Sequence, residues 1–544
     1  MRKRHFLIVA AGCLLIAIGP LTAVARAADK PAASLPAPVA IDPANPPRGV
    51  FADEWYAVML AGKKCGQMHT RMARLSGKGG DIIETWTKMQ LTLRRDQAEV
   101  SIGIEQKTNE TLDGVPRSFL RTMYLGRQPV TTEGTVTNGK VSIASTQFGQ
   151  QLPAQVFDYP AGAVMDWGAY REQFRRGLKP GTKYDVLVYE PTVSPDRPCK
   201  TTFEVLGPEV VDLFGRKVEA IKTRQAMQLP QATGKPTTQD TTLWLTDAGT
   251  VVRMTMTVLE IPIEVFGCSK AVAMADNDPA ELMVGTLVQL AGPIDADRAT
   301  RITYRIRLKN PSDSNPLPDF PDTAMQKVTA HSDREATVVV SRASALTGVR
   351  PQTLSPEDRQ RCLAASAAVN YKDPKVADLA RQAAGSEKDP RKLADKLSRF
   401  VSGYISTKSL NVGFATASEV ARSREGDCTE HGVLLAALGR GNGIPTRVVT
   451  GLVYTDEFGG KSNVLVGHLW TQFWIDSQWV DVDSALRQHT NVDPTHIAMA
   501  IGSASDDGFA DLVAATWLSL GKLAITVVEV DGRSTVPHPT TAAP

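Results

Sequence analysis

Residues 425–431, EGDCTEH, and the apolar run that follows them decide the fold of this chain. From Val433 to Leu438 the apolar residues recur at helical spacing, and the sequence GNG at 441–443 ends the helix. Cys428 is therefore expected at a helix N-terminus. Unsatisfied backbone N–H groups and the helix dipole favour an anion there, so they lower the pKa of a thiol and make it the reactive thiolate.

Two predicted strands follow this helix and carry a histidine and an aspartate. The stretch GHLWTQFWI, 467–475, alternates as a half-buried strand does, with His468 on one face. A two-residue turn at 476–477 leads into the returning strand WVDVD, 479–483. In a hairpin of this register Asp483 lies diagonal to His468 on the same face, whereas a slip of one residue would turn Asp483 to the other face.

Cys428, His468 and Asp483 together match the needs of acyl transfer by a thiol. Such a reaction requires a nucleophile, a base that protonates the leaving group, and a carboxylate that fixes the imidazole tautomer. Each residue alone has a simpler explanation, as a buried core thiol, a packed strand histidine or a strand-end aspartate. The joint pattern favours a catalytic triad.

At these residues the chain resembles the transglutaminase-like superfamily of papain-related thiol enzymes, and its bacterial secreted branch in particular. The resemblance rests on GDCTEH at 426–431, GIPTRVVTG at 443–451, GHLW at 467–470 and WVDVD at 479–483. It extends from about residue 373 to about residue 530. It implies a papain-like α+β fold with Cys428 as nucleophile, His468 as base and Asp483 as the orienting acid.

The sequence departs from the animal cross-linking members of that superfamily. Their nucleophile stands in GQCW and a tryptophan that stabilises the oxyanion precedes it, whereas here no tryptophan occurs between Trp244 and Trp470. The second oxyanion donor is thus unidentified. No acidic calcium loop and no cofactor are implied. His431 follows Cys428 by one helical turn, but a zinc site there lacks a further ligand cluster. Asp493 and His496 belong to the resembling stretch and are expected to be structural or to lie at the cleft rim.

Upstream of this core the sequence is typical of an antiparallel β-sheet. Val100, Ile102 and Ile104 alternate with polar residues, and the turn sequence at 247–249 separates two apolar runs. The expected fold class is multidomain, with a large antiparallel sheet in the N-terminal domain and an α+β core at the C-terminus. The expected parts are a signal peptide at 1–27, a Pro/Ala-rich linker at 28–50, a β-rich domain at 51–275, a strand-bearing connector at 276–350, the catalytic core at 351–532 and a disordered tail at 533–544.

The first 27 residues have the physics of an export signal. A basic start at 2–4 precedes an apolar run, and Ala25 and Ala27 flank Arg26 in a cleavage-site pattern. An uncleaved membrane anchor is the alternative, since residues 6–25 are long enough to span a bilayer. We therefore expect export to the periplasm, cell envelope or medium.

Charge and cysteine content limit the remaining possibilities. The chain has 61 basic and 58 acidic residues, and removal of the four basic residues before position 27 leaves 57 against 58, so the body lacks the cationic field that nucleic-acid binding requires. Of six cysteines, cleavage of the signal leaves Cys65, Cys199, Cys268, Cys362 and Cys428. Four could form two disulfides in three possible pairings, or the thiols could be buried and free.

The sequence therefore predicts an exported enzyme that acts on peptide or side-chain amide bonds through a thioester. A peptidase or amidase is the first hypothesis, and transfer of the acyl group to an amine, including protein cross-linking, is the second. A third hypothesis is a binding module with a catalytically silent core. The expected partner is a protein or peptide substrate, with association to membrane or cell envelope also open. The oligomeric state is not predicted.

Overall fold

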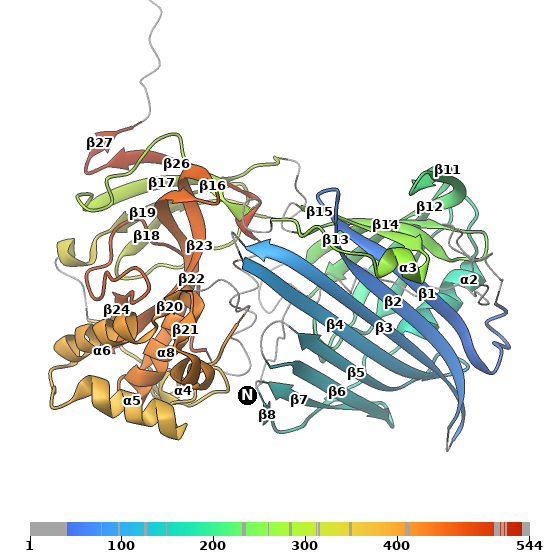
Figure 1. Cartoon of the computed structure of the whole chain (residues 1–544), viewed down its shortest axis with the longest axis horizontal. Helices are drawn as coiled ribbons and strands as arrows, with labels where there is room; N and C mark the ends of the chain where they lie inside the picture. The colour runs from blue at the N-terminus through green and yellow to red at the C-terminus, as the bar shows by residue number, and fades with distance from the viewer. Residues whose placement is uncertain are drawn as a thin grey trace, which may run out of the picture. The chain divides into compact units, whose positions relative to one another are not determined.

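The protein is described from a computed structural model that covers residues 41–535. Gaps lie at 78, 96–97, 125–127, 148, 231–235, 259–260, 282–285, 312, 314–315, 347–350, 409–413, 505–511, 513–515 and 517–518. The predicted signal peptide and the first part of the linker lie outside the described residues. The chain divides into two compact units, with the boundary between residues 282 and 283 (Figure 1). In the described residues, no helix is long and apolar enough to cross a membrane.

The described residues of the N-terminal unit form one antiparallel sheet of fifteen strands and two helices, α2 (Asp166–Arg176) and α3 (Lys270–Ala273). The strands are β1 (Gly49–Leu60), β2 (Lys63–Gly77), β3 (Gly80–Arg95), β4 (Ala98–Thr111), β5 (Pro116–Tyr124), β6 (Val130–Thr137), β7 (Lys140–Gln147), β8 (Gln150–Gln151), β9 (Gln155–Asp158), β10 (Lys183–Val188), β11 (Cys199–Leu213), β12 (Arg216–Leu229), β13 (Thr237–Leu245), β14 (Val251–Val258) and β15 (Ile261–Cys268).

Chain order and spatial order largely agree in this sheet. Strands β1 to β8 follow one another, β10 to β15 do the same, and the pairing of β1 with β15 joins the two runs. The long strands β1 to β4 lie side by side (Figure 1). This is the large antiparallel sheet that the alternating sequence predicts, and the turn at 247–249 separates β13 from β14.

The packing of this unit begins earlier than the sequence indicates. Ile41, within the expected linker, is buried with Phe51, Met72 and Trp167 in one apolar cluster. One buried apolar side chain within a Pro/Ala-rich stretch gives no periodic signal. The last part of the expected linker is therefore attached to the sheet.

In the part of the C-terminal unit that the structure describes, three sheets are combined with a group of helices. Its elements are β16 (Val288–Gln289), β17 (Arg301–Leu308), β18 (Gln326–His331), β19 (Glu335–Ser341), the 3₁₀-helix η2 (Ala343–Ala345), α4 (Pro356–Leu363), α5 (Pro374–Ala384), α6 (Pro390–Tyr404), β20 (Thr407–Lys408), α7 (Ala417–Ser423), β21 (Glu425–Gly426), α8 (Cys428–Gly441), β22 (Thr446–Phe458), β23 (Lys461–Ile475), β24 (Gln478–Val482), β25 (Ile497–Gly502), β26 (Leu523–Val530) and β27 (Arg533–Ser534).

Two five-stranded sheets share one apolar core in this unit. The first has the order β16-β23-β22-β25, with β24 paired to β23, and the second has the order β18-β19-β17-β26-β27. Tyr304 of the second sheet and Leu452 of the first lie in the same buried cluster. The segment expected as a connector, 276–350, thus supplies four strands of the C-terminal unit, β16 in the first sheet and β17, β18 and β19 in the second. Strand β17 of this segment pairs with β26, which is distant in sequence, so local patterning does not reveal the pairing. Residues 533–534, expected in the tail, form β27.

The hairpin of β23 and β24 has the register that the sequence predicts. Ile475 lies opposite Gln478, and Thr471 lies opposite Val482. Asp483 follows directly and forms an antiparallel bridge with His489. The two-residue turn fixes this register, because both turn residues, Asp476 and Ser477, adopt positive φ angles.

Helix α8 lies close against β23 because it carries glycine where the two elements touch. A Cβ atom on Gly432 would lie 2.1 Å from Cδ2 of Leu469, which is itself buried. The Thr471 hydroxyl donates to the Gly432 carbonyl oxygen across the same contact at 3.1 Å. This contact sets the distance between the helix that begins with Cys428 and the strand that carries His468.

We expect Gly432→Ala to destabilise the fold by about 1–3 kcal/mol, because the added methyl group overpacks the interface of α8 and β23. Urea unfolding monitored by circular dichroism measures this change. Gly403→Ala in α6 is the control, since a Cβ there meets no atom within 4 Å and should leave stability unchanged or raise it by about 0.5–1 kcal/mol. Equal stabilities of the two variants would contradict the close-approach argument.

The thiols of the described chain support the free-thiol alternative. Cys65, Cys268 and Cys362 are buried free thiols, and Cys428 is a free thiol that is only partly buried. Two disulfides therefore cannot form among the five cysteines. Cys428 is the accessible one of these four.

Candidate active site

The first turn of α8 is built by a reciprocal cap. The Asp427 side chain accepts from the Thr429 backbone N–H at 2.9 Å, and the Glu430 side chain accepts from the Asp427 backbone N–H at 2.9 Å. Cys428 is the first residue of the helix, as the sequence predicts. Its own N–H points out of the helix end, where no intrahelical acceptor exists.

Glu430 also ties this turn to the preceding chain. Its carboxyl is buried and accepts from the Ala415 N–H at 2.9 Å, and burial together with the nearby Asp427 charge raises its pKa well above the ordinary range. A Cβ on Gly426 would lie 2.2 Å from the Glu430 Cβ, so only glycine leaves room for this side chain. Glu430 is thus a structural part of the motif, and its spacing from Asp427 in the sequence is that of a capping box.

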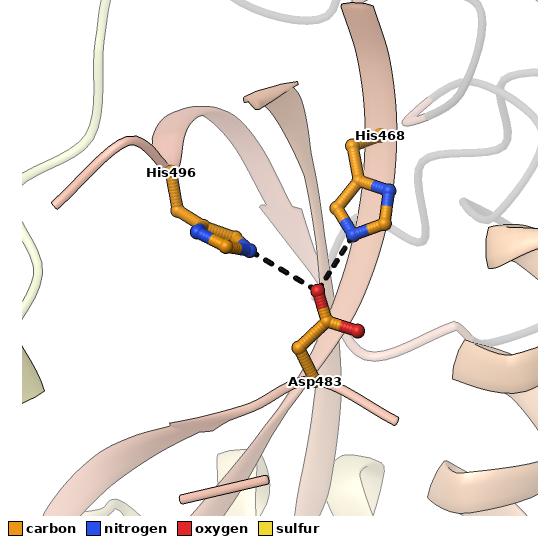
Figure 2. Close-up of side chains that lie close together, drawn as sticks. All are labelled: His468, Asp483 and His496. Atoms are coloured by element: carbon orange, nitrogen blue, oxygen red, sulfur yellow. Dashed lines mark hydrogen bonds and ion pairs between the residues drawn. The ribbon is translucent and has the colours of Figure 1, made fainter. Parts of the chain in front are cut away.

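The structure brings Cys428, His468 and Asp483 together. The Cys428 thiol lies close enough to the imidazole of His468 to raise the pKa of that histidine. Nε2 of that imidazole lies 2.7 Å from Oδ2 of Asp483, so Nδ1 is the ring nitrogen left on the other side (Figure 2). His468 is 8% and Asp483 1% exposed, so the partly buried thiol is the member of the group that solvent reaches most readily.

Asp483 is held in place on both carboxylate oxygens. Oδ1 accepts from the backbone N–H groups of Ala485 at 2.8 Å and Leu486 at 3.0 Å. Oδ2 faces His468. Burial alone would raise the pKa of Asp483, but the charge and hydrogen bond of His468 hold it well below the usual range, so the carboxylate is ionised.

The electrostatics of the site favour a protonated His468. Burial on its own lowers the pKa of His468, but the Asp483 charge, its hydrogen bond and the contact with Cys428 outweigh burial and raise the pKa to about 9. A histidine with this pKa keeps its second proton at neutral pH. It can therefore pair with a thiolate.

A second histidine, His496, meets the same carboxylate oxygen. Its Nε2 lies 3.1 Å from Oδ2 of Asp483, and the two imidazoles approach this oxygen from different sides (Figure 2). We expected His496 to be structural or at the cleft rim, yet it is buried and in direct contact with Asp483. The sequence signal for a buried, paired His496 was the carboxylate of Asp493, three residues before it.

Two sets of residues bear on metal binding. In the described part of the chain, the side chains placed to hold a cation are His468, Asp483 and His496, whose ligand atoms lie within 4.8 Å of one another. Cys428 and His431 do not form such a set. The Nδ1 of His431 donates to the Asp427 carbonyl oxygen at 2.7 Å, and burial lowers the pKa of this histidine. The first set is already satisfied by its own hydrogen bonds.

Residues 377–484 match the profile of the Transglutaminase-like superfamily. No curated protein matches the chain. Solved structures with similarity to it include a protein of Cytophaga hutchinsonii provisionally named a cysteine protease, with 13% identity, 42% of this chain and 86% of that chain covered, and a TM-score of 0.27. The periplasmic domain of TgpA from Pseudomonas aeruginosa has 15% identity, covers 36% and 92%, and has a TM-score of 0.23.

A third similar structure is a β-barrel-like protein of Brucella abortus, a domain of unknown function named DUF1849. Its identity is 16%, the coverage is 40% of this chain and 96% of that chain, and the TM-score is 0.30. The structural similarities are weak, and the profile match is the specific one. It spans the whole segment from α5 to Asp483 and Ser484. In this C-terminal core the chain is therefore similar to the transglutaminase-like superfamily, a family of thiol enzymes in general.

Proposed function

We propose that the protein is an exported thiol-dependent enzyme that cleaves peptide or side-chain amide bonds through a thioester on Cys428. The observation that carries the proposal is the 2.7 Å hydrogen bond between His468 Nε2 and Oδ2 of Asp483, with the Cys428 thiol beside this pair at the start of α8. Nucleophile, base and orienting acid are then gathered in the order that acyl transfer by a thiol requires.

In the first half of the reaction the Cys428 thiolate attacks the amide carbonyl carbon. The backbone N–H of Cys428, at the start of α8, donates to the oxygen that becomes negative. The C–N bond then breaks, and protonated His468 gives its proton to the leaving amine. The product of this half is a thioester and a neutral His468.

In the second half, neutral His468 takes a proton from water, and the resulting hydroxide attacks the thioester carbon. The C–S bond breaks, the carboxylic acid leaves, and the thiolate–imidazolium pair is restored. An amine in place of water would give acyl transfer. Export, by a signal at 1–27 that lies outside the described residues, is part of the proposal.

We expect Cys428 to react with iodoacetamide quickly at pH values well below the ordinary thiol pKa of about 8.5, and its rate to change again near pH 9 as His468 loses its proton. Mass spectrometry of the modified peptide measures the rate at each pH. His468→Ala should lose the enhanced reaction at low pH. Cys362 in the same sample is the internal control, because its buried thiol should react slowly.

Substrate assays then separate hydrolysis from transfer. Incubation with a protein mixture, with and without a biotinylated primary amine, distinguishes new peptide N-termini from amine incorporation. Incorporation without hydrolysis would assign the second function. A slow, ordinary thiol that is indifferent to His468 would contradict both and favour the silent binding module.

A further inference from the structure

Both ring nitrogens of His496 face carboxylate oxygens. Nε2 lies 3.1 Å from Oδ2 of Asp483, and Nδ1 lies 3.3 Å from Oδ1 of Asp493. An ionised carboxylate can only accept a hydrogen bond, and a neutral imidazole has only one N–H to donate. Two such contacts at once require an imidazolium. His496 is 3% exposed, so water does not replace either partner.

Asp493 is fixed as an acceptor by its own neighbours. It accepts from the Thr495 N–H at 2.8 Å and from the Thr495 hydroxyl at 2.6 Å, while Gln488 donates to its other oxygen at 2.5 Å. Burial would raise the pKa of Asp493, but His496 and Thr495 lower it to about 2. The carboxylate is therefore ionised at neutral pH.

The loop that carries these residues is attached to the second sheet. The Tyr304 hydroxyl of β17 donates to the Pro494 carbonyl oxygen at 3.1 Å. Gln326 of β18 donates to the Ala498 carbonyl oxygen and accepts from the Ala498 N–H, both at 2.9 Å. His496 lies in the chain between these two attached residues, so the backbone that carries its ring is fixed on both sides.

The surroundings of His496 contain charges of both signs. Asp483 and Asp493 touch it, His468 shares Asp483 with it, and the Asp481 carboxylate acts on it from β24. The Trp470 ring meets the imidazole edge-on, with the ring centroids 5.2 Å apart. Burial lowers the pKa of His496, but the hydrogen bonds and charges of Asp483 and Asp493 raise it to about 9.

From this geometry we infer that His496 is a positioning residue of the Cys428 site: as an imidazolium clamped between Asp483 and Asp493, it fixes Asp483 toward His468 and limits how tightly His468 holds its proton. The inference rests on the proposed function only where it treats Cys428 and His468 as reacting groups. Asp483, His496 and Asp493 together present a net charge of about −1 to His468, where Asp483 and Asp493 alone would present about −2.

Two substitutions should therefore move His468 in opposite directions. His496→Gln can still donate to Asp483 but removes the positive charge, so His468 should keep its proton to a pH higher by about one unit. Asp493→Asn keeps the imidazolium and removes a negative charge, so His468 should lose its proton at a pH lower by about one unit. A purely structural role of His496 predicts no such opposition.

The experiment is an NMR titration of the full mature chain labelled with ¹³C at histidine Cε1, with each signal assigned by the loss of its peak in a His→Gln variant. In the wild type we expect His496 to titrate near pH 9. His331→Gln is the matched control, because His331 lies on β18 with 29% of its side chain exposed and should leave both signals unchanged.

A His496 signal that titrates near the ordinary value of about 6.5 in the wild type would overturn the inference, whether or not the variants fold. Shifts of His468 in the same direction in both variants, or in neither, would also overturn it. The titration needs no substrate. A protein without amidase activity can therefore still support the clamp, and an active enzyme can still contradict it.

Discussion

We expect Cys428→Ala to abolish turnover, with kcat/KM lower by about 10⁴-fold or more. The thiolate is the group that forms the covalent bond, and the cap of Asp427 and Glu430 that supports it remains when only the sulfur is removed. Cys428→Ser should be nearly as inactive, because a hydroxyl is far less acidic than a thiol and His468 does not ionise it. The initial rate on the substrate found in the screen is the measurement.

Cys362→Ala serves as the control for this pair, since it removes a buried thiol of α4 outside the site. It should retain the wild-type rate after correction for the folded fraction. Residual activity of Cys428→Ala above one percent of wild type would show that another group performs the chemistry. The unchanged melting temperature of Cys428→Ser would exclude loss of folding as the cause.

Asp483→Asn has the second-largest expected effect, a fall in kcat of about 10²–10⁴-fold. Asp483 accepts four hydrogen bonds: two from backbone N–H groups on Oδ1 and two from imidazoles on Oδ2. An asparagine amide must turn its NH₂ toward one of these pairs of donors. Either orientation sets N–H groups against N–H groups, so the tautomer or the position of His468 changes.

The pH dependence of Cys428 alkylation checks this mechanism beside the activity assay. In Asp483→Asn, His468 should lose its proton well below the wild-type value of about 9, so the enhanced alkylation at low pH should disappear. Asp481→Asn is a matched change on the same hairpin, since Asp481 binds Trp470 and Gln472 instead of a histidine. Equal losses in the two variants would contradict a specific role of Asp483.

The parts of the site that local sequence determines could be predicted. The position of Cys428 follows from the helical pattern of apolar residues, which begins just after Cys428 and ends at Gly441. The pairing of His468 with Asp483 follows from a two-residue turn, because such a turn leaves one register. Both predictions depend on contacts between neighbours in the chain, which is why periodicity was sufficient.

Contacts between distant segments could not be predicted. His496 contacts Asp483 from a segment that β17 and β18 hold by hydrogen bonds. No sequence pattern indicates that residues 301–331 pack against this segment. The pairing of β1 with β15 is equally remote in sequence. A single buried polar contact has no period, so a sequence pattern cannot reveal it.

The pairing of β17 with β26 has a consequence for how the site is assembled. Every residue of the site lies in the chain between these two adjacent strands, so the second sheet is completed only when residues 523–530 arrive. Closing so long a loop is entropically costly and slow. During synthesis, an emerging chain would hold Cys428 in a core that lacks β26, so the reactivity proposed for this thiol should appear only after β26 has docked.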